Sequence, residues 1–277
     1  MRAPTVGRKL YSTVMFVLVS VLGGVLVAGL AVPTAGVGAE LAKVGATALQ
    51  SLPREIETLI NAKHENLISV FDIFRSNHRL FIFMGFAANG DISGYMKKHG
   101  GINETKLVCK WFLQASRGLA FLHNQLGTCH RDIKPDNILL DANWVAMLSD
   151  FGFAKIVVDE EKQRIELSST FCGTRPYEAP QVLECKPYNG LKADIWSMGV
   201  TLFVMLHDTL PFPYKDLKEM LRLIGQWPKS VTDKMRRKVA GEAINLQLAM
   251  LNPTEKDRAS VNDLVDNEWL KHNAQQQ

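Results

Sequence analysis

Cysteine is scarce in this chain of 277 residues, which contains only four: Cys109, Cys129, Cys172 and Cys185. No two of them form a C-x-x-C pair, and no spacing of Cys and His is typical of metal ligands. These absences argue against a disulfide-stapled module and a zinc site, and free thiols in a reducing compartment are the better interpretation. The sequence also lacks repeats and a basic stripe interleaved with aromatic residues, so its formal net charge of +4 predicts no nucleic-acid partner.

Charged residues are absent from Leu10 to Ala39. Within this region, residues 13–32 are apolar and would span about 30 Å as a helix, which matches the core of a bilayer. We therefore predict an N-terminal apolar helix in residues 1–50, with membrane association through residues 13–32. Several interpretations stay open: a transmembrane anchor, a signal peptide, a buried helix, or a segment foreign to the domain, such as a misjoined exon.

The most informative segment is His130–Asn137, which reads H-R-D-I-K-P-D-N and is followed at residues 150–152 by D-F-G. Each residue alone would be interpreted as an ordinary loop residue, but fixed identities at fixed offsets make a chance match very unlikely. In this order and at this spacing, the two motifs resemble the catalytic loop and the metal-binding loop with which protein kinases transfer the γ-phosphoryl group of ATP.

Phosphoryl transfer needs positioning, metal ions and charge neutralisation more than covalent chemistry. We therefore expect Asp132 to accept or orient the proton of the substrate hydroxyl. The side-chain oxygen atoms of Asn137 and Asp150 suit a hard ion such as Mg²⁺. Lys134, two residues after Asp132, can reach the transferring phosphate. The predicted cofactors are ATP and Mg²⁺.

The resemblance extends over residues 51–277, which are similar to a eukaryotic serine/threonine protein kinase. Residues 172–180 resemble the end of an activation segment, residues 194–199 resemble the D-x-W-x-x-G opening of the central helix, and Arg258 resembles the late arginine of the large lobe. Lys134 after H-R-D indicates serine or threonine as acceptor. The stretches LPREIE, DFGFAK and TFCGTRPYEAP are most similar to the testis-specific serine kinase group, near the calcium/calmodulin-kinase branch.

This resemblance implies an α+β, bilobal, protein-kinase-like fold. Its parts would be a truncated small lobe with an incomplete antiparallel sheet over residues 51–86, a mainly helical large lobe over 87–272, and a tail over 273–277. Hydrophobic periodicity predicts the individual elements. They are helices near 53–62, 91–99, 104–125 and 194–207, and strands at 67–74 and 79–86.

The resemblance also implies roles for residues outside the two motifs. The expected nucleotide-binding residues are Glu55, which would pair with a strand lysine, the gatekeeper Met84, the hinge residues Gly85, Phe86 and Ala87, and the adenine floor Leu139. Leu59, His130 and Phe151 would stack as a regulatory spine, although plain core packing is an equally good interpretation of such apolar positions.

Regulatory and substrate-binding positions follow from the same resemblance. Thr170 lies where activation-segment threonines are phosphorylated, and Arg131 could pair with that phosphate. Asp91 and Asp136 match acidic positions that favour an arginine upstream of the acceptor in the protein substrate. An ordinary exposed loop residue is the alternative interpretation for each.

Three features of the family are missing or altered. No G-x-G-x-x-G and no V-A-I-K-like strand precede Glu55, so ATP should bind weakly and be poorly oriented. The A-P-E motif reads A-P-Q, with Gln181 at its end. Gln181 can hydrogen-bond Arg258 but cannot neutralise its charge. We therefore expect this contact to be weaker than the pair that the glutamate of the A-P-E motif would form with Arg258.

Two functions therefore remain open. The first is ATP-dependent phosphorylation of serine or threonine on protein substrates, and the alternative is a membrane-tethered pseudokinase that acts as a binding module. Three basic residues precede the apolar run and only Lys43 follows it closely, so the positive-inside rule would place the lobe outside the cytosol. Because kinase chemistry needs ATP, we instead expect the lobe on the cytoplasmic face, with the helix not inserted or not native.

Overall fold

The computed structural model describes residues 14–20, 31–32, 62–76, 79–159 and 164–275. The chain divides into two compact units. The first unit comprises Met1–Ala62 and Ser69–Phe86, and the second comprises Lys63–Ile68 and Ala87–Gln277. Each unit is described by itself.

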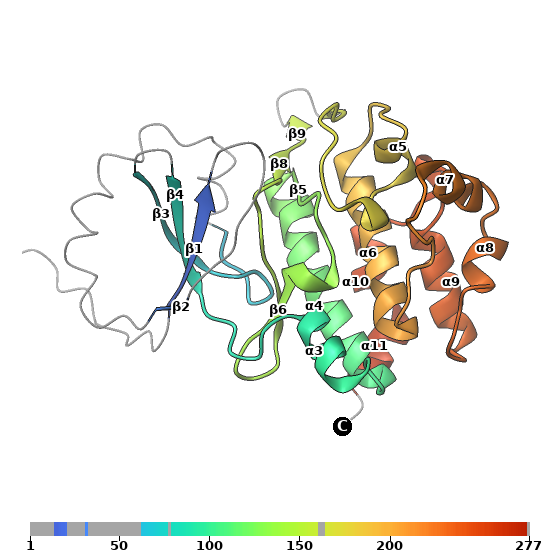
Figure 1. Ribbon diagram of the computed structural model, residues 1–277, viewed down its shortest axis with the longest axis horizontal. Helices are drawn as coiled ribbons and strands as arrows, with labels where there is room; N and C mark the ends of the chain where they lie inside the picture. The colour runs from blue at the N-terminus through green and yellow to red at the C-terminus, as the bar shows by residue number, and fades with distance from the viewer. Residues whose placement is uncertain (1–13, 21–30, 33–61, 77–78, 160–163, 276–277) are drawn as a thin grey trace, which may run out of the picture. The chain divides into compact units, whose positions relative to one another are not determined.

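The first unit contains an antiparallel sheet with the strand order β2-β1-β4-β3 (Figure 1). Its strands are β1 (Val14–Ser20), β2 (Ala31–Val32), β3 (Val70–Ser76) and β4 (Arg79–Gly85). The two strands predicted between residues 67 and 86 are confirmed as the β3–β4 hairpin. The helix predicted near 53–62 lies outside the described residues except for Ala62.

The predicted N-terminal apolar helix is wrong for the residues that the structure describes there. Val14–Ser20 pairs along its whole length with β4, from Val14 opposite Gly85 to Ser20 opposite Arg79. This run is rich in β-branched valine, which favours strands, and an apolar run alone cannot distinguish a strand from a helix. Parts of residues 1–50 thus share one sheet with β3 and β4. Among the described residues, no helix is long and apolar enough to cross a membrane.

The second unit is mainly helical, as predicted. Its helices are α3 (Ile92–His99), α4 (Thr105–Leu126), α5 (Pro180–Leu183), α6 (Gly190–His207), α7 (Leu217–Gly225), α8 (Lys229–Thr232), α9 (Gly241–Met250), α10 (Val261–Val265) and α11 (Glu268–Gln275). The predicted helices at 91–99, 104–125 and 194–207 are confirmed, the last starting four residues earlier because Asn189 caps it. The predicted tail is wrong for residues 273–275, which belong to α11.

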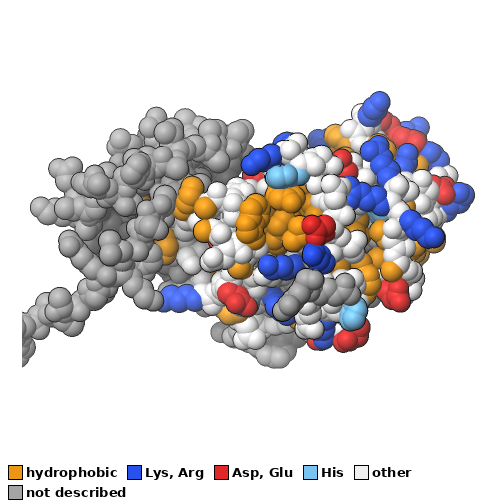
Figure 2. All heavy atoms as spheres, turned by 90° about the horizontal axis from the view of Figure 1, so that it is seen from below, with side chains coloured by type: hydrophobic (Ala, Val, Ile, Leu, Met, Phe, Trp, Pro, Cys, Tyr) orange, Lys and Arg blue, Asp and Glu red, His pale blue; other side chains and the backbone are white. Residues whose placement is uncertain are grey.

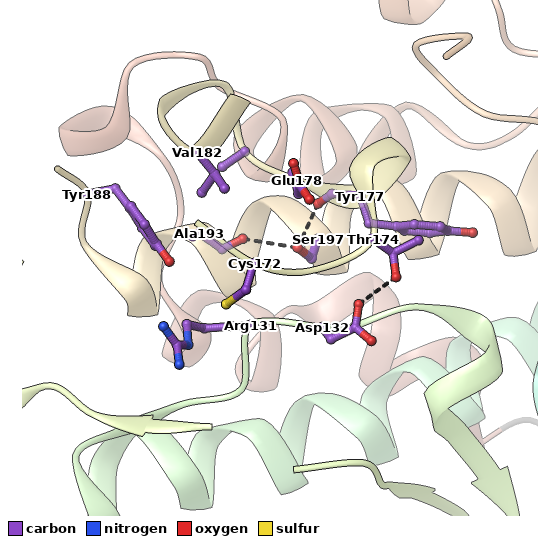
Figure 3. Close-up of a pocket in the computed structure, with 11 residues that line it drawn as sticks. Arg131, Asp132, Cys172, Thr174, Tyr177, Glu178, Val182, Tyr188, Ala193 and Ser197 are labelled. Carbon is purple, nitrogen blue, oxygen red and sulfur yellow. Dashed lines mark hydrogen bonds between the residues drawn. The ribbon is translucent and has the colours of Figure 1, made fainter. Parts of the chain in front are cut away.

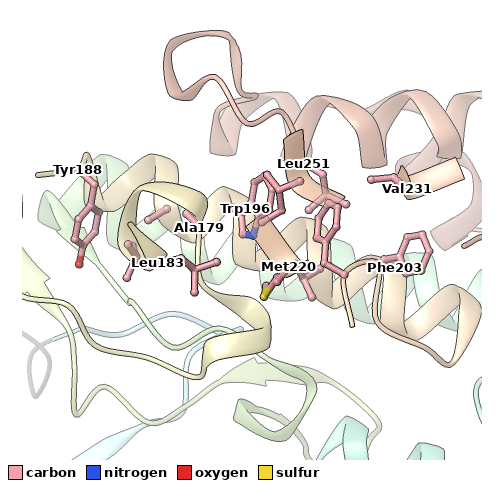
Figure 4. Packing of buried hydrophobic residues seen from close by; sticks show 13 residues of the cluster. Ala179, Leu183, Tyr188, Trp196, Phe203, Met220, Val231 and Leu251 are labelled. Atoms are coloured by element: carbon pink, nitrogen blue, oxygen red, sulfur yellow. The ribbon is translucent and has the colours of Figure 1, made fainter. Parts of the chain in front are cut away.

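The core of this unit is built around α6, which lies between α4 and α9 (Figure 1). The helix is apolar nearly all round because it is buried on most sides. Trp196 stacks on Phe212 at a centroid distance of 5.6 Å, and Phe203, Met220 and Leu251 belong to the same buried cluster (Figure 4). This packed helix supports the loops of the second unit.

Three short antiparallel pairs hold those loops. They are β5 (Thr128–Cys129) with β8 (Lys155–Ile156), β6 (Ile138–Leu140) with β7 (Ala146–Leu148), and β9 (Val158–Asp159) with β10 (Arg164–Ile165). Three 3-10 turns complete the unit: η2 (Pro135–Asn137), η3 (Arg175–Tyr177) and η4 (Glu255–Asp257).

The surface of the described residues mixes side chains of different kinds. On the face shown in Figure 2, hydrophobic side chains form a patch, and Lys, Arg, Asp and Glu side chains lie around it. Trp144 and Leu167 are among the exposed large hydrophobic residues of the second unit, with exposed fractions of 41% and 57%. The absence of a nucleic-acid partner stays a prediction.

Gly118 in α4 allows the segment Lys63–Ile68 to lie directly on this helix. A Cβ atom at Gly118 would be 2.3 Å from the carbonyl oxygen of Asn66. That carbonyl accepts a hydrogen bond from the amide of Leu148 at 2.9 Å, so it cannot easily move away. We expect Gly118→Ala to destabilise the second unit by about 2 kcal/mol, even after the gain in helix propensity. Thermal unfolding should show a midpoint lower by roughly 4–8 °C.

Gly225→Ala is the matched control for this variant. Gly225 ends α7, and no heavy atom lies within 4 Å of the position that its Cβ would take. Its unfolding midpoint should stay unchanged or rise slightly, because alanine lowers the entropy of the unfolded chain. Equal midpoints for Gly118→Ala and Gly225→Ala would contradict the close approach of Asn66 to α4.

Candidate active site

The segment His130–Asn137 forms the loop between β5 and β6, and Asp150 follows β7. Because β6 and β7 pair with Ile138 opposite Leu148, the residues just outside this ladder lie at the same end of it. The amide and the hydroxyl of Ser149 both donate to the carbonyl of Asn137, at 2.9 and 3.0 Å. The β6–β7 hairpin therefore brings Asn137 and Asp150 to the same end of the ladder, although they belong to two separate motifs.

The carboxylate of Asp132 is the centre of the loop. Its exposed fraction is 4%, and it accepts three side-chain hydrogen bonds. Lys134 Nζ and Asn137 Nδ2 donate to Oδ2 at 2.7 and 2.9 Å, and Thr174 Oγ1 donates to Oδ1 at 2.7 Å. A carboxylate offers about four acceptor positions, two on each oxygen. One position on Oδ1 is thus left for a further donor, such as a substrate hydroxyl.

Lys134 links this carboxylate to the activation segment. Its ammonium group also donates to Thr174 Oγ1 at 2.7 Å. An ammonium group has three donors, so one remains beyond the bonds to Asp132 and Thr174. A positive charge with an open donor beside the carboxylate is suited to an anionic group of the substrate, such as phosphate.

The buried carboxylate of Asp194 at the start of α6 fixes the backbone of the loop. Its oxygens accept hydrogen bonds from the amides of His130 and Arg131, both at 2.7 Å, and lie 2.8 Å from His123 Nε2. Arg131 has a left-handed φ of 69°, a strained conformation for a residue other than glycine. The two hydrogen bonds from the backbone amides of His130 and Arg131 to Asp194 hold Arg131 in this conformation.

Asp150 has a different environment from Asp132. Its φ is 61°, and its Oδ1 accepts a hydrogen bond from the Gly152 amide at 3.3 Å. Burial raises the pKa of Asp150, the negative charge of Asp132 raises it further, and His130 counteracts both. A partly buried carboxylate whose charge is disfavoured by its surroundings is suited to binding a cation.

The predicted magnesium ligands fit this ion. The amide nitrogen of Asn137 donates to Asp132, which turns the side-chain oxygen to the other side of the amide group. Among the residues that the structure describes, no group of three or more His, Cys, Asp or Glu side chains could hold a metal. Mg²⁺ is usually held by one or two carboxylates together with phosphate and water oxygens. Asn137 and Asp150 supply donors of this kind.

A small cavity lies beside Asp132, between the catalytic loop and the end of the activation segment (Figure 3). Its free space of about 10 Å³ holds one water molecule at most. Thr174 and Tyr177 lie next to Asp132 on its wall, and the hydroxyl of Ser197 donates to the Tyr177 carbonyl at 2.7 Å. The cavity is too small for a substrate, but its walls fix the segment that contacts the carboxylate.

The predicted nucleotide-binding residues are not all in one unit. Met84, Gly85 and Phe86 end the first unit, with Met84 buried, Phe86 38% exposed, and the Gly85 amide bonded to the Ser69 carbonyl at 2.8 Å. Ala87 and Leu139 belong to the second unit, where Leu139 forms a bridge with Asp91. Glu55 lies outside the described residues. The roles of these residues in binding ATP stay predictions.

The predicted regulatory residues are also described. Thr170 is exposed, and its carbonyl accepts a hydrogen bond from the Tyr188 hydroxyl at 2.8 Å. Arg131 donates from Nε to the Phe153 carbonyl at 2.5 Å, while its buried Nη1 has no hydrogen-bond partner among the described residues. The pairing of Arg131 with a phosphate on Thr170 stays a prediction.

The predicted contact within the regulatory spine is confirmed in part. The rings of His130 and Phe151 meet edge to face at a centroid distance of 5.5 Å, and Leu59 lies outside the described residues. Of the two predicted arginine-binding carboxylates, Asp136 is exposed, whereas Asp91 caps α3 by accepting a hydrogen bond from the Gly94 amide at 2.7 Å.

Comparison with known proteins decides the family. A family model described as "Protein kinase domain" matches residues 39–270. The chain belongs to this family. The match covers the catalytic loop, the D-F-G motif and all helices of the second unit except the last residues of α11.

The most similar relatives include testis-specific kinases. Testis-specific serine/threonine-protein kinase 2 of Mus musculus is 35% identical over 221 residues, which are 79% of this chain and 61% of the relative. Testis-specific serine/threonine-protein kinase 4 of Homo sapiens is 35% identical over 230 residues, which are 79% of this chain and 68% of the relative. CBL-interacting serine/threonine-protein kinase 2 of Arabidopsis thaliana is 35% identical, with 80% of this chain and 47% of the relative covered.

These relatives confirm the resemblance to serine/threonine kinases of this group. This kinase chain spans about 60% of the length of the first relatives that it matches. What the whole relatives do is therefore carried to this chain only as a proposal.

Two residues of this kinase site were placed in family motifs by the sequence but were not predicted as site residues. Thr174 is 42 positions from Asp132, and nothing in the spacing of the motifs indicates that its hydroxyl meets the carboxylate. Asp194 gave a clearer signal, because a carboxylate in a nearly all-apolar helix needs buried donors. The sequence does not show that those donors are the amides of the catalytic loop.

The predicted hydrogen bond between Gln181 and Arg258 is confirmed. Arg258 is 2% exposed, and its Nη2 donates to Gln181 Oε1 at 3.0 Å. Its other bonds include the carbonyls of Asn252 and Lys192, both at 2.9 Å, and its guanidinium lies 5.1 Å from the Trp196 ring centre. Burial lowers the pKa of Arg258 to about 10. The hydrogen-bond partners of this buried cation are thus neutral, and the negative charge of Glu255 offsets only part of the effect of burial.

Gln181→Glu should stabilise this kinase domain. A carboxylate would neutralise Arg258, although it would lose the bond from Gln181 Nε2 to the Pro253 carbonyl at 2.7 Å. Because the guanidinium of Arg258 is already desolvated, a carboxylate placed against it should gain more than the lost neutral bond, and we expect a net gain of about 1–2 kcal/mol. The thermal midpoint should rise by roughly 2–8 °C. Gln181→Leu, which removes both bonds, should lower it. A midpoint that falls in both variants would contradict the account of Arg258 as a buried cation without a charged hydrogen-bond partner.

Proposed function

We propose that this chain transfers the γ-phosphoryl group of ATP to serine or threonine hydroxyls of protein substrates. The observation that carries this proposal is the carboxylate of Asp132, which is buried, held by Lys134, Asn137 and Thr174, and left with one open acceptor position. A carboxylate held in this way is a fixed proton acceptor for a hydroxyl placed next to it.

This geometry supports the following reaction. The substrate hydroxyl gives its proton to Asp132 as its oxygen forms a bond to the γ-phosphorus. The bond between that phosphorus and the bridging oxygen breaks, and ADP leaves with the electron pair. Lys134 neutralises negative charge close to Asp132, to which it is already bonded at 2.7 Å. Asn137 and Asp150 would hold magnesium, which would supply further neutralisation of the phosphates.

We expect a modest rate for this transfer. The sequence ahead of Glu55 has no G-x-G-x-x-G and no V-A-I-K-like strand to cradle and clamp the phosphates. A reacting group misplaced by about 1 Å can cost on the order of 100-fold in rate. Weak orientation of ATP should therefore lower the turnover without abolishing it, since the groups around Asp132 do not depend on that cradle.

Acceptor selectivity tests the proposal. The full chain is incubated with Mg²⁺ and γ-labelled ATP and with three peptides that differ only in a serine, threonine or tyrosine acceptor. Label should enter the serine and threonine peptides, and EDTA should prevent it. Absence of transfer to all three peptides at millimolar ATP would overturn the proposal and favour a binding module.

A further inference from the structure

We propose that Arg175 selects substrates with an acidic side chain next to the acceptor serine or threonine. This inference rests on the proposed function, because it concerns the peptide that the same site would bind. The acidic group could be aspartate, glutamate or a phosphorylated residue, all of which present oxygen atoms to a guanidinium.

The position of Arg175 follows from Thr174. The Thr174 hydroxyl contacts Asp132 Oδ1 and Lys134 Nζ, both at 2.7 Å, so this part of the activation segment touches the reacting carboxylate. Arg175 is the next residue, about 3.8 Å further along the chain. An acceptor that reaches Asp132 must place its own neighbour about the same distance away. The long side chain of Arg175 can cover that distance.

The backbone at Arg175 is fixed. Residues Arg175–Tyr177 form the turn η3, in which the Tyr177 amide donates to the Thr174 carbonyl at 2.8 Å. The Glu178 amide donates to the Arg175 carbonyl at 3.1 Å, and Pro176 restricts the backbone further. A fixed turn presents the guanidinium in one place, as selectivity requires.

Arg175 is exposed, and Tyr214 anchors its guanidinium. Its Nη1 donates to the Tyr214 hydroxyl at 2.5 Å, and the group lies 5.7 Å from the centre of the Tyr214 ring. In the part of the chain that the structure describes, its hydrogen-bond partner is thus a neutral hydroxyl. A guanidinium has five N–H donors, so enough remain to bind a carboxylate with two parallel hydrogen bonds.

Among the described residues, Glu178 is the carboxylate whose charge acts on Arg175. Its charge interacts with Arg175, but its side chain is partly buried and lines the cavity beside Asp132 (Figure 3). Burial raises the pKa of Glu178, and this is the largest influence on it. Among the described residues, Glu178 accepts no hydrogen bond from Arg175, and the hydrogen-bond partner of the exposed guanidinium is the Tyr214 hydroxyl, so donors remain for a substrate.

A purely structural role is the competing explanation. Arg175 could simply tie the activation segment to Tyr214, which lies in the loop between α6 and α7. In that case a substitution would change the thermal midpoint of the protein but not its preference among peptides. Peptide preference is therefore the property that separates the two explanations.

The test uses the full chain and serine peptides that carry aspartate, alanine or lysine on either side of the acceptor. For wild type, kcat/KM should rank aspartate over alanine over lysine at one of these positions, with about 2- to 10-fold between aspartate and alanine, through KM rather than kcat. The preference should shrink as salt is added, because the pair is exposed to solvent. Arg175→Glu should reverse the ranking, and Arg175→Gln should flatten it.

Tyr214→Phe keeps the ring and frees the guanidinium, so it should retain the preference for aspartate even if Arg175→Glu folds poorly. Equal kcat/KM values for aspartate and lysine peptides in wild type, or an unchanged ranking in Arg175→Glu or Arg175→Gln, would overturn the inference while phosphorylation itself persists. Absence of phosphorylation of every peptide would instead overturn the proposed function, and this inference with it.

Discussion

Asp132→Asn should lower kcat by about 10²- to 10⁴-fold and leave the affinity for Mg²⁺-ATP nearly unchanged. Asparagine has the size of aspartate, and its one oxygen can take the place of Oδ2 and accept the hydrogen bonds from Lys134 and Asn137. Its NH₂ group would then face the Thr174 hydroxyl, which can accept a hydrogen bond. Asparagine cannot take up the proton of the substrate hydroxyl. The loss should therefore appear in turnover, which steady-state kinetics with a serine peptide measures directly.

A control separates this loss from unfolding. Asp132 is buried, so its thermal midpoint must be compared with that of wild type. Asp266→Asn is a matched change at a remote carboxylate whose side chain is 77% exposed, and it should leave kcat unchanged. If Asp132→Asn retained wild-type turnover, the carboxylate would not be the proton acceptor, and the proposed mechanism would fail.

Asp150→Asn should abolish the Mg²⁺-dependent binding of nucleotide and lower phosphoryl transfer by about 100-fold or more. A neutral amide is a much weaker ligand for a hard divalent ion than a carboxylate. The same substitution should leave the stability of the protein without ligand equal or higher. Burial raises the pKa of Asp150, so its negative charge costs more free energy in the folded chain than in the unfolded chain, and a neutral residue avoids that cost.

Asp150→Asn should weaken ligand binding without lowering the stability of the ligand-free protein. Thermal unfolding with and without ligand is therefore a sharp test of the role of Asp150. Mg²⁺ with ATP should raise the midpoint of wild type, because a ligand that binds only the folded state stabilises it. The variant should start at the same midpoint or a higher one and show no further rise. An equal rise in both proteins would contradict the assignment of Asp150 as a metal ligand.

Local patterns predicted much of the helical unit. The amphipathic spacing of residues 104–125 gave α4, and the apolar run at 194–207 gave most of α6, because in both cases burial determines the pattern. The catalytic loop was predicted from fixed residue identities rather than from periodicity. Its convergence with Asp150 depends on the β6–β7 pairing, which short strands do not reveal in the sequence.

The failures have physical causes as well. Residues 14–20 were predicted as a helix because length and hydrophobicity suit a membrane span, yet the same valine-rich run suits a strand that pairs with β4. Thr174 was missed because its bond to Asp132 joins residues that only the tertiary fold brings together. The Gln181–Arg258 bond was predicted because a family motif specifies both positions.

Calorimetric titration of the full chain with ATP, with and without Mg²⁺, tests most directly whether Asp132, Asn137 and Asp150 form one phosphoryl-transfer site. The account predicts weak but saturable binding that needs Mg²⁺ and disappears in Asp150→Asn. Binding that is equal with and without Mg²⁺, or no binding at millimolar ATP, would contradict it.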